Sequence, residues 1–462
     1  MARLYISATH KSSGKTTVSI GLCAALRAQG SIVQPFKKGP DYIDPLWLGA
    51  ASGRPCHNLD FNTMTPDEII HTVQRYSRDT DIALIEANKG LYDGMALDGS
   101  DSNAAVAKLT RSPVVLVVDT RGMTRGIAPM LLGYQTFDRN INIAGIIFNR
   151  VGGTRHAAKL RESVEHYTDI KVLGAVQNNP DMEIEERHLG LMPSNESGEA
   201  EAQIARIRDL VAAQVDLKLL REIAATSASL PASSLPLCKR GIEGDFLRIA
   251  ICQDPAFGFY YPGDLEALQQ AGAELVPVNT LTDAALPSDI DGLFIGGGFP
   301  ETHMQQLAAN VAMRESIHAA IDNGLPTYAE CGGLMYHSRS LIWNGQQAEM
   351  VGIIPGDAVM HLKPQGRGYV KLQETAAMPW PGGDSSHTIN AHEFHYSRLE
   401  NLTATGKFAY RMQRGTGIDG QHDGWICRNL LASYTHIRDT SQFHWAQRFV
   451  AFIRQTTRKT PA

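Results

Sequence analysis

The stretch T-Y-A-E-C-G-G-L, residues 327–334, decides the fold of the second half of this chain. The apolar residues 325–329 predict a short buried strand, and residues 334–341 predict a helix. Cys331 and two glycines lie between them, so the chain must turn sharply there. A thiol at such a turn lies beside backbone N–H groups, which lower its pKa and can stabilise an oxyanion. We therefore interpret Cys331 as a nucleophile; the alternative is a buried cysteine between packing glycines.

A second glycine-rich loop, G-G-G-F-P-E at residues 296–301, follows a strand predicted at 292–295. Glycines at a strand end expose backbone N–H groups, so Gly297 and Gly298 are candidate oxyanion donors facing Cys331. A tight strand-to-helix turn would use glycine equally well. The residues alone leave these two interpretations open.

A cysteine nucleophile needs a base, which is usually a histidine. His436, in L-A-S-Y-T-H-I-R, lies about a hundred residues after the thiol, and such pairs meet in space rather than in sequence. A single histidine is more often structural, so the pattern alone does not assign His436. The segment H-E-F-H-Y-S, residues 392–397, differs in spacing from H-E-x-x-H and has no evident third ligand, so we expect no zinc there.

Composition indicates an ordinary globular protein of two or three domains, with 462 residues and 43% hydrophobic content. The net charge of −5 does not favour nucleic-acid or membrane binding. The N-terminal M-A-R-L-Y-I-S lacks the apolar region of a signal peptide, and no apolar run approaches the roughly 18 residues that span a bilayer. Six scattered cysteines without a C-x-x-C pair are typical of reduced thiols, so we expect a cytoplasmic protein.

The chain begins with a pattern typical of phosphate binding. A strand at residues 4–7 is followed by A-T-H-K-S-S-G-K-T-T, which ends in Gly14, Lys15, Thr16 and Thr17, and by a helix up to residue 28. Backbone N–H groups of such a loop receive phosphates, the lysine contacts the terminal phosphate and the first threonine can bind magnesium. The alternative is a basic surface turn. We predict that this loop binds a nucleotide, with ATP and Mg²⁺ as the cofactors.

Further strands in the first half end in polar residues that suit the same site. A strand at 33–36 precedes K-K-G-P-D-Y-I-D-P, residues 37–45, and strands at 82–85, 114–118 and 143–148 end in Glu86, Asp119 and Asn149. Ligands bind at the carboxyl ends of parallel strands. We expect Asn149 at the nucleotide and either Glu86 or Asp119 at magnesium, a choice that the sequence leaves open.

Strands that alternate with helices in both halves predict an α/β protein with parallel sheets. Residues 202–220 predict a helix, and residues 224–245 then lose periodicity in a Ser-, Ala- and Pro-rich stretch typical of a linker. We therefore predict an ATP-binding domain over residues 1–223 and a second domain over residues 246–462.

The chain resembles the cobyrinic acid a,c-diamide synthase family, the two-domain glutamine amidotransferases that act on tetrapyrroles. The motifs that carry the resemblance span both halves and are, in order, G-K-T-T (14–17), K-K-G-P-D-Y-I-D-P (37–45), G-L-Y-D-G (90–94), R-H-L-G-L (187–191), F-Y-Y-P (259–262), G-G-G-F-P-E (296–301), A-E-C-G-G-L-M-Y (329–336), H-E-F-H-Y-S (392–397) and A-S-Y-T-H (432–436).

The resemblance implies a P-loop amide synthetase domain similar to dethiobiotin synthetase, followed by a class I-type glutaminase. It implies Cys331 as nucleophile and His436 as its base. Class I enzymes carry a glutamate two residues after this histidine, whereas this chain has Arg438. We therefore expect a dyad and name no third member.

For the synthetase domain, the resemblance implies amidation of the a and c acetate carboxylates of a tetrapyrrole through an acyl phosphate, with ammonia from glutamine. It implies that Asp41, Tyr42 and Asp93 bind the substrate and that Glu86 belongs to the same region. The sequence leaves open whether the chain works as a homodimer.

One departure from the family leaves the substrate open. Relatives typically read E-G-V-M-G-L-Y-D-G, whereas this chain reads E-A-N-K-G-L-Y-D-G at residues 86–94, which introduces polarity and a cation. The chain is thus also similar to the branch that amidates sirohaem for dissimilatory sulfite reductase. An alternative of another class is a nucleotide-switched partitioning or scaffolding ATPase, although such a protein would not need a thiol at a glycine turn.

Overall fold

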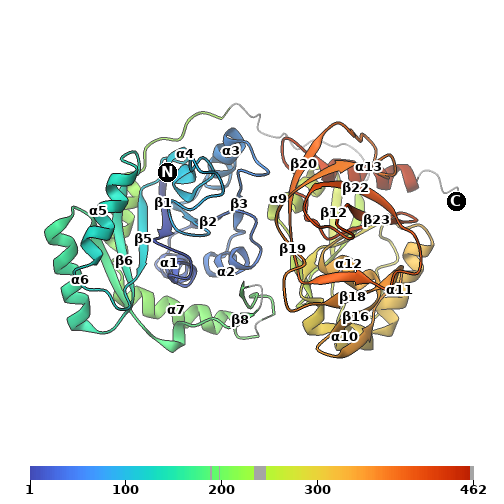
Figure 1. The fold of residues 1–462 in the computed structure, drawn as a ribbon, viewed down its shortest axis with the longest axis horizontal. Helices are drawn as coiled ribbons and strands as arrows, with labels where there is room; N and C mark the ends of the chain where they lie inside the picture. The colour runs from blue at the N-terminus through green and yellow to red at the C-terminus, as the bar shows by residue number, and fades with distance from the viewer. Residues whose placement is uncertain (188–189, 197, 234–245, 458–462) are drawn as a thin grey trace. The chain divides into compact units, whose positions relative to one another are not determined.

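The computed structural model describes residues 1–187, 190–196, 198–233 and 246–457. It divides into two compact units, Met1–Pro236 and Leu237–Ala462. Each unit has its own central β-sheet with helices packed on it (Figure 1). The predicted α/β class is confirmed.

The sheet of the first unit has seven strands in the order β3-β2-β4-β1-β5-β6-β7, and every neighbouring pair is parallel. This arrangement places the carboxyl ends of all seven strands at one edge. The strands are β1 (Ala2–Ala8), β2 (Val33–Lys38), β3 (His57–Leu59), β4 (Ile82–Glu86), β5 (Val114–Asp119), β6 (Ile143–Val151) and β7 (Lys171–Gln177), and a separate pair is β8 (Glu186–Arg187) and β9 (Gly190–Leu191).

Helices cover both faces of this sheet, because successive strand residues point to opposite sides. Leu4 and Ile6 of β1 pack with α1, α2, α7 and α8, while Tyr5 packs with α3 to α6. Strands β4 and β5 are therefore apolar up to their last residue, as expected of strands that are buried on both faces in a parallel sheet. The helices are α1 (Lys15–Ala28), α2 (Ile43–Ser52), α3 (Pro66–Tyr76), α4 (Asn103–Leu109), α5 (Ile127–Phe137), α6 (Thr154–Tyr167), α7 (Ala200–Gln214) and α8 (Leu217–Ala225), with a 3₁₀ turn η1 (Pro180–Met182).

The single helix predicted at residues 202–220 is wrong, since α7 ends and α8 begins within it. The Asp216 side chain accepts a hydrogen bond from the Leu219 N–H (2.9 Å) and so caps a new helix. The predicted linker starts inside α8, and the Pro231 carbonyl oxygen accepts a hydrogen bond from Gln74 of the first unit (2.6 Å). Residues 234–245 lie outside the described residues, so the linker itself stays a prediction.

The second unit has a nine-stranded mixed sheet in the order β12-β10-β13-β15-β24-β23-β22-β19-β20. The first five strands are parallel and the rest antiparallel. Its strands are β10 (Leu247–Cys252), β12 (Ala273–Val278), β13 (Gly292–Ile295), β15 (Thr327–Glu330), β19 (Gly366–Glu374), β20 (Thr388–His395), β22 (Lys407–Arg414), β23 (His422–Cys427) and β24 (Leu430–Ser433). Two smaller sheets contain β11 (Phe257–Phe259) with β14 (Gly297–Gly298), and β16 (Ser338–Trp343), β17 (Gln346–Glu349), β18 (Ile354–Met360) and β21 (Ser397–Glu400).

Helices again pack on both faces of the large sheet, with α10 and α11 in one core and α9 and α13 in the other. They are α9 (Pro262–Gln270), α10 (Met304–Ala309), α11 (Val311–Asp322), α12 (Gly332–His337) and α13 (Trp445–Thr457), with a 3₁₀ turn η2 (Pro300–His303). The helix predicted at 334–341 is wrong beyond residue 337. The chain continues there as β16, because that segment pairs with β17 and β18. No helix in the described part of either unit has the length and apolarity to cross a membrane.

Candidate active sites

The phosphate loop of the first unit connects β1 to α1 and contains two left-handed residues, Ser12 (φ 64°) and Gly14 (φ 80°). A Cβ on Gly14 would lie 2.2 Å from Nδ2 of Asn149, and the same Nδ2 donates a hydrogen bond to the Ser13 carbonyl oxygen (2.9 Å). The loop therefore needs glycine at residue 14, and the end of β6 holds it in place. Such an open backbone cradle suits a nucleotide phosphate.

Glu86 is the last residue of β4, and its side chain contacts the first turn of α1. Its Oε1 accepts a hydrogen bond from the Thr16 hydroxyl (2.8 Å) and lies 3.6 Å from Nζ of Lys15. Its Oε2 is buried and has no hydrogen-bond partner among the described residues. Burial lowers the pKa of Lys15, and the neighbouring charge of Lys37 lowers it further. A hydroxyl and an unpartnered carboxylate oxygen beside a phosphate loop are ligands that magnesium prefers, so these residues fit the cation.

Lys37, near the end of β2, is a buried cation, with only 1% of its surface exposed. Its Nζ contacts Asp44 and donates to Glu86 Oε1 (2.9 Å) and to the Ala87 carbonyl oxygen (3.2 Å). Burial alone would lower the pKa of Lys37, but Asp44, Glu86 and Asp41 raise it well above its ordinary value. Lys37 is thus a cation that joins the loop after β2 to the end of β4.

The pKa values of Asp41, in the loop after β2, and of Asp44, in the first turn of α2, are shifted in opposite directions. Burial raises the pKa of Asp41 to about 6, and the charge of Asp44 adds to this shift. Burial would also raise the pKa of Asp44, but Lys37 and Lys15 lower it. Asp44 is therefore the ionised partner of the lysines, whereas Asp41 takes up a proton as the pH falls through about 6.

Asp119, the other magnesium candidate, faces arginines instead of the threonine of the loop. Its carboxylate pairs with Arg121 (2.7 Å) and Arg150 (2.8 Å), and Arg150 also donates to the Ser12 carbonyl oxygen (2.8 Å). Burial opposes ionisation of Asp119, but hydrogen bonds from Arg121 and Arg150 lower its pKa to about 2. The geometry therefore favours Glu86 at the cation and gives Asp119 a role in holding the phosphate loop.

A cavity of about 420 Å³ lies against the phosphate loop. Gly14 and Thr17 line one side of it, and the amide side chains of Gln177, Asn178 and Asn179 line another. Amide groups both donate and accept hydrogen bonds, as the edge of a nucleotide base requires. This cavity therefore suits the base of a nucleotide whose phosphates lie in the loop.

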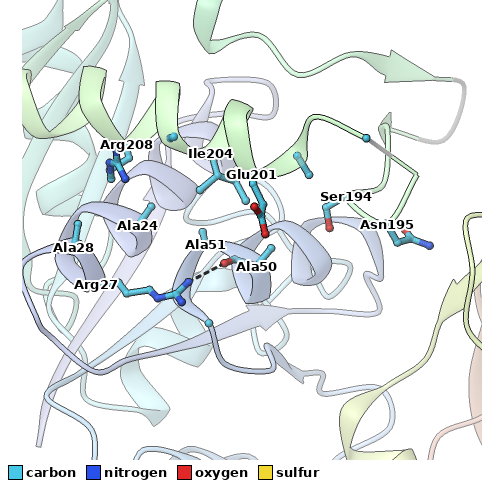
Figure 2. A pocket seen from close by; sticks show the side chains of 14 residues that line it. Ala24, Arg27, Ala28, Ala50, Ala51, Ser194, Asn195, Glu201, Ile204 and Arg208 are labelled. Carbon is cyan, nitrogen blue, oxygen red and sulfur yellow. Dashed lines mark hydrogen bonds between the residues drawn. The ribbon is translucent and has the colours of Figure 1, made fainter. Parts of the chain in front are cut away.

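A larger cavity of about 920 Å³ lies between α1, α2 and the start of α7 (Figure 2). It lies at the far end of α1 from the phosphate loop, about 20 Å away for a helix of this length. Arg27 at its edge donates a hydrogen bond to the Ala50 carbonyl oxygen (3.3 Å) and so completes the end of α2. None of the predicted site residues lines this cavity. The larger volume of this cavity is therefore no reason to place the active site there.

In the second unit, Cys331 occupies the turn between β15 and α12. Its backbone has φ 48° and ψ −99°, a conformation that side chains other than glycine rarely adopt. The Cys331 N–H donates a hydrogen bond to the Ser433 carbonyl oxygen of β24 (2.7 Å). Strain of this kind costs about 1–3 kcal/mol and is typical of functional sites. The strained backbone conformation of this turn is thus that of Cys331, the residue predicted to be the nucleophile.

The expectation of a lowered thiol pKa is wrong for this structure. Cys331 is 8% exposed, and burial raises the pKa of its thiol. The carboxylates of Glu301 and Glu330 raise it further. The thiol is therefore protonated at neutral pH and needs a base when it reacts.

Glycine is required after Cys331 because the turn packs against the backbone of residues 295–298. A Cβ on Gly332 would lie 3.0 Å from the Gly298 nitrogen, and one on Gly333 would lie 2.3 Å from the Ile295 carbonyl oxygen. The two predicted oxyanion residues, Gly297 and Gly298, form β14 and are thereby adjacent to the thiol's turn.

His436 reaches the same place from β24, three residues beyond Ser433. A Cβ on Gly297 would lie 2.7 Å from Cε1 of the His436 ring, so the histidine lies against β14. Nδ1 of His436 lies 3.2 Å from Oε2 of Glu330, the residue immediately before Cys331. The structure thus brings Cys331, His436 and the glycine loop to one location, at the ends of adjacent parallel strands.

Comparison with known proteins covers both units. A family model described as the CobB/CobQ-like glutamine amidotransferase domain matches residues 248–442, and one described as an AAA domain matches residues 2–186. The cobyrinate a,c-diamide synthase of Magnetococcus marinus is 45% identical, over 98% of this chain and 97% of the relative. That of Methanosarcina acetivorans is 40% identical, over 94% and 92%.

The chain belongs to the cobyrinate a,c-diamide synthase family. The resemblance inferred from the motifs is confirmed, as are the P-loop domain and the glutamine amidotransferase domain. The enzymes of this family are ATP-dependent glutamine amidotransferase ligases, which leaves the switch ATPase without support. The names of these relatives do not favour the sirohaem alternative.

Most residues predicted for the synthetase site lie together in this family member. Lys15, Thr16 and Glu86 are in contact, and Asp41 lies 3.9 Å from Nζ of Lys37, which contacts Glu86. The remaining predicted residues border this group. Tyr42 precedes α2, Asp93 accepts a hydrogen bond from the Gly90 N–H (2.9 Å), and Thr17 lines the smaller cavity.

The motifs did not single out three residues that the structure places in these sites. Lys37 and Asp44 lie within the quoted K-K-G-P-D-Y-I-D-P motif, and their position after a strand was the available signal. Glu330 lies in the A-E-C-G-G motif, but its contact with His436 joins residues more than a hundred positions apart. No local pattern could have revealed that contact. Part of the R-H-L-G-L motif, residues 188–189, lies outside the described residues.

Proposed function

We propose that this protein amidates the a and c acetate carboxylates of cobyrinic acid, with ATP as the activating substrate and glutamine as the nitrogen donor. The observation that carries the proposal is a strained cysteine turn beside a histidine, in the same chain as a phosphate loop with an unpartnered carboxylate oxygen. The kinship with enzymes named cobyrinate a,c-diamide synthase over nearly the whole chain supports this substrate.

In the first unit, the phosphate loop from Gly14 to Thr17 would hold the ATP phosphates, with Lys15 at the terminal one. Thr16 and Glu86 would hold magnesium, which when bound neutralises phosphate charge. Asn149 and the cavity of about 420 Å³ would position the nucleoside. A carboxylate oxygen of the substrate attacks the γ-phosphorus and ADP leaves, which gives an acyl phosphate. Ammonia then adds to the acyl carbon, phosphate leaves and the amide remains.

Residues next to this loop suit a substrate with several carboxylates. Burial lowers the pKa of Lys38, the charges of Asp60 and Asp101 oppose this shift, and the positive charge of Lys89 adds to it, so the two cations lie close enough to interact. Both would attract a polyanion. Asp41, whose pKa is raised to about 6, could in its protonated form donate a hydrogen bond to a substrate carboxylate, with Tyr42 and Asp93 as further contacts.

In the second unit, His436 accepts the Cys331 proton as the sulfur attacks the carboxamide carbon of glutamine. The N–H groups of Gly297 and Gly298 would stabilise the oxyanion. His436 then donates this proton to the leaving nitrogen, which departs as ammonia, and water hydrolyses the remaining thioester to glutamate. The raised thiol pKa of Cys331 supports proton transfer to a base during the attack.

The test is to incubate the purified full chain with ATP, magnesium, glutamine and cobyrinic acid and to analyse the product by mass spectrometry. We expect a monoamide followed by a diamide, with one ADP and one glutamate formed per amide. Sirohaem is the comparison substrate. Conversion of sirohaem with no product from cobyrinic acid would refute the proposed substrate, and no amide from either would refute the proposed reaction.

A further inference from the structure

We propose that Glu330 is the positioning residue of His436, and that its carboxylate selects the imidazole tautomer that accepts the Cys331 proton. This inference rests on the proposed function, in which His436 is the base of the glutaminase reaction. It would give the site a third member in place of the carboxylate that class I enzymes carry after the histidine.

Glu330 contacts three donor groups, one from its own strand β15 and two from the segment that follows β24. Its Oε2 lies 3.2 Å from Nδ1 of His436, and its Oε1 accepts hydrogen bonds from the Tyr328 hydroxyl (2.6 Å) and from the Ile437 N–H (3.2 Å). Glu330 and His436 are each 3% exposed. A buried carboxylate that accepts hydrogen bonds on both oxygens is held in one orientation. The carboxylate therefore presents a fixed acceptor to one nitrogen of the ring.

This acceptor determines where the proton of the neutral imidazole lies. An ionised carboxylate can only accept hydrogen bonds, so Nδ1 must carry the hydrogen and Nε2 the lone pair. Burial and the charge of Glu330 raise the pKa of Tyr328 well above its ordinary value, so this tyrosine is a stable hydroxyl donor to Oε1. The base that remains in the ring is Nε2.

The position used by class I enzymes offers no alternative carboxylate. Arg438 stands two residues after His436, and its guanidinium lies over the Tyr261 ring, 4.8 Å from the centroid. A second group that contacts the histidine is His392, whose ring stacks on that of His436 with centroids 5.0 Å apart. Burial lowers the pKa of His392 well below its ordinary value, so this neighbour is neutral. His392 therefore restricts the ring plane, while Glu330 supplies the charge.

The proposed step moves one proton and breaks one C–N bond. The thiol proton of Cys331 passes to Nε2 while the sulfur bonds to the carboxamide carbon of glutamine. The imidazolium then returns this proton to nitrogen as the C–N bond breaks and ammonia leaves. Throughout, Nδ1 keeps its hydrogen and its contact with the Glu330 carboxylate, which stabilises the imidazolium that forms in between.

The kinetic test compares Glu330→Gln with Tyr328→Phe and wild type. The glutamine variant keeps the size of the side chain but loses the charge, so glutaminase kcat should fall by roughly 100-fold or more. The KM for glutamine should change by less than about threefold, because Glu330 contacts Nδ1 of the imidazole and acts through His436. Tyr328→Phe keeps the carboxylate–imidazole contact and should lower kcat by less than about tenfold.

A second measurement uses the wild-type protein and so does not depend on how a variant folds. NMR of protein labelled with ¹⁵N-histidine, with His436 assigned from the signal lost in His436→Ala, should show hydrogen on Nδ1 in the neutral ring. Hydrogen on Nε2, or a Glu330→Gln variant with kcat within threefold of wild type, would overturn the inference. Failure of wild type to release ammonia from glutamine would instead refute the proposed function.

Discussion

Gly297 lies so close to the His436 ring that the substitution Gly297→Ala should displace the ring and lower glutaminase activity. A Cβ on Gly297 would lie 2.7 Å from Cε1 of the His436 ring and 3.3 Å from Cβ of Phe259. Carbon atoms that are not bonded prefer about 3.5–4.0 Å. In Gly297→Ala, the ring or the strand must therefore move by about 1 Å.

Movement of the ring is the outcome that affects catalysis. A misplacement of about 1 Å costs a reaction on the order of 100-fold in rate, or about 2.7 kcal/mol of barrier. Alanine keeps the backbone N–H of residue 297, so the loss would report on the position of His436 and not on a missing oxyanion donor. We therefore expect glutaminase kcat to fall about 100-fold in Gly297→Ala.

The assay is release of glutamate from glutamine by the full chain, with Gly263→Ala as the matched control. Gly263 lies in α9 of the same unit, and a Cβ there would meet nothing within 4 Å. The control should keep wild-type kcat and gain up to about 1 kcal/mol of stability from better helix propensity. A Gly297→Ala enzyme with more than a third of wild-type kcat would refute the position assigned to His436.

The remaining predictions concern the cation site and stability. Glu86→Gln should raise the magnesium concentration needed for ATP turnover by about tenfold or more, while Asp119→Asn should leave it unchanged. A magnesium titration that shows the reverse would make Asp119 and not Glu86 the ligand of the cation. Hydrogen bonds from Arg339 lower the pKa of Asp357 to about 2, although burial opposes this. Asp357→Asn should therefore lose about 1–2 kcal/mol at pH 7, discounted for the half-exposed arginine. The wild-type advantage is present above about pH 4 and is lost as the pH falls through about 2; equal loss at pH 7 and pH 2 in thermal unfolding would contradict the ion pair.

The local features of this protein could be predicted from its sequence. The phosphate loop and the cysteine turn are each formed by consecutive residues, so their glycines and flanking apolar strands identify them. The alternation of strands and helices likewise predicts the α/β class. The Asp216 cap, which divides the predicted helix into α7 and α8, is also a local feature, because its side chain accepts a hydrogen bond from a residue three positions later.

Other features depend on contacts between residues far apart in the chain. The choice between Glu86 and Asp119 needed the positions of Thr16 and two arginines. The raised pKa of Cys331 results from burial, which a motif does not report. Residues 338–343 form a strand because of the neighbours that pair with them. In each of these cases, contacts between residues far apart in the chain determine a structure or a pKa that the local sequence does not predict.

The central claim is that nitrogen is released at Cys331 in the second unit and consumed at an activated carboxylate in the first. The most direct test is the amidation rate of Cys331→Ala with glutamine and with ammonium salts, measured beside wild type. We predict no detectable amide from glutamine and an ammonia-dependent rate within about twofold of wild type. Equal loss of both activities in a folded variant would contradict this division of the reaction between the two units.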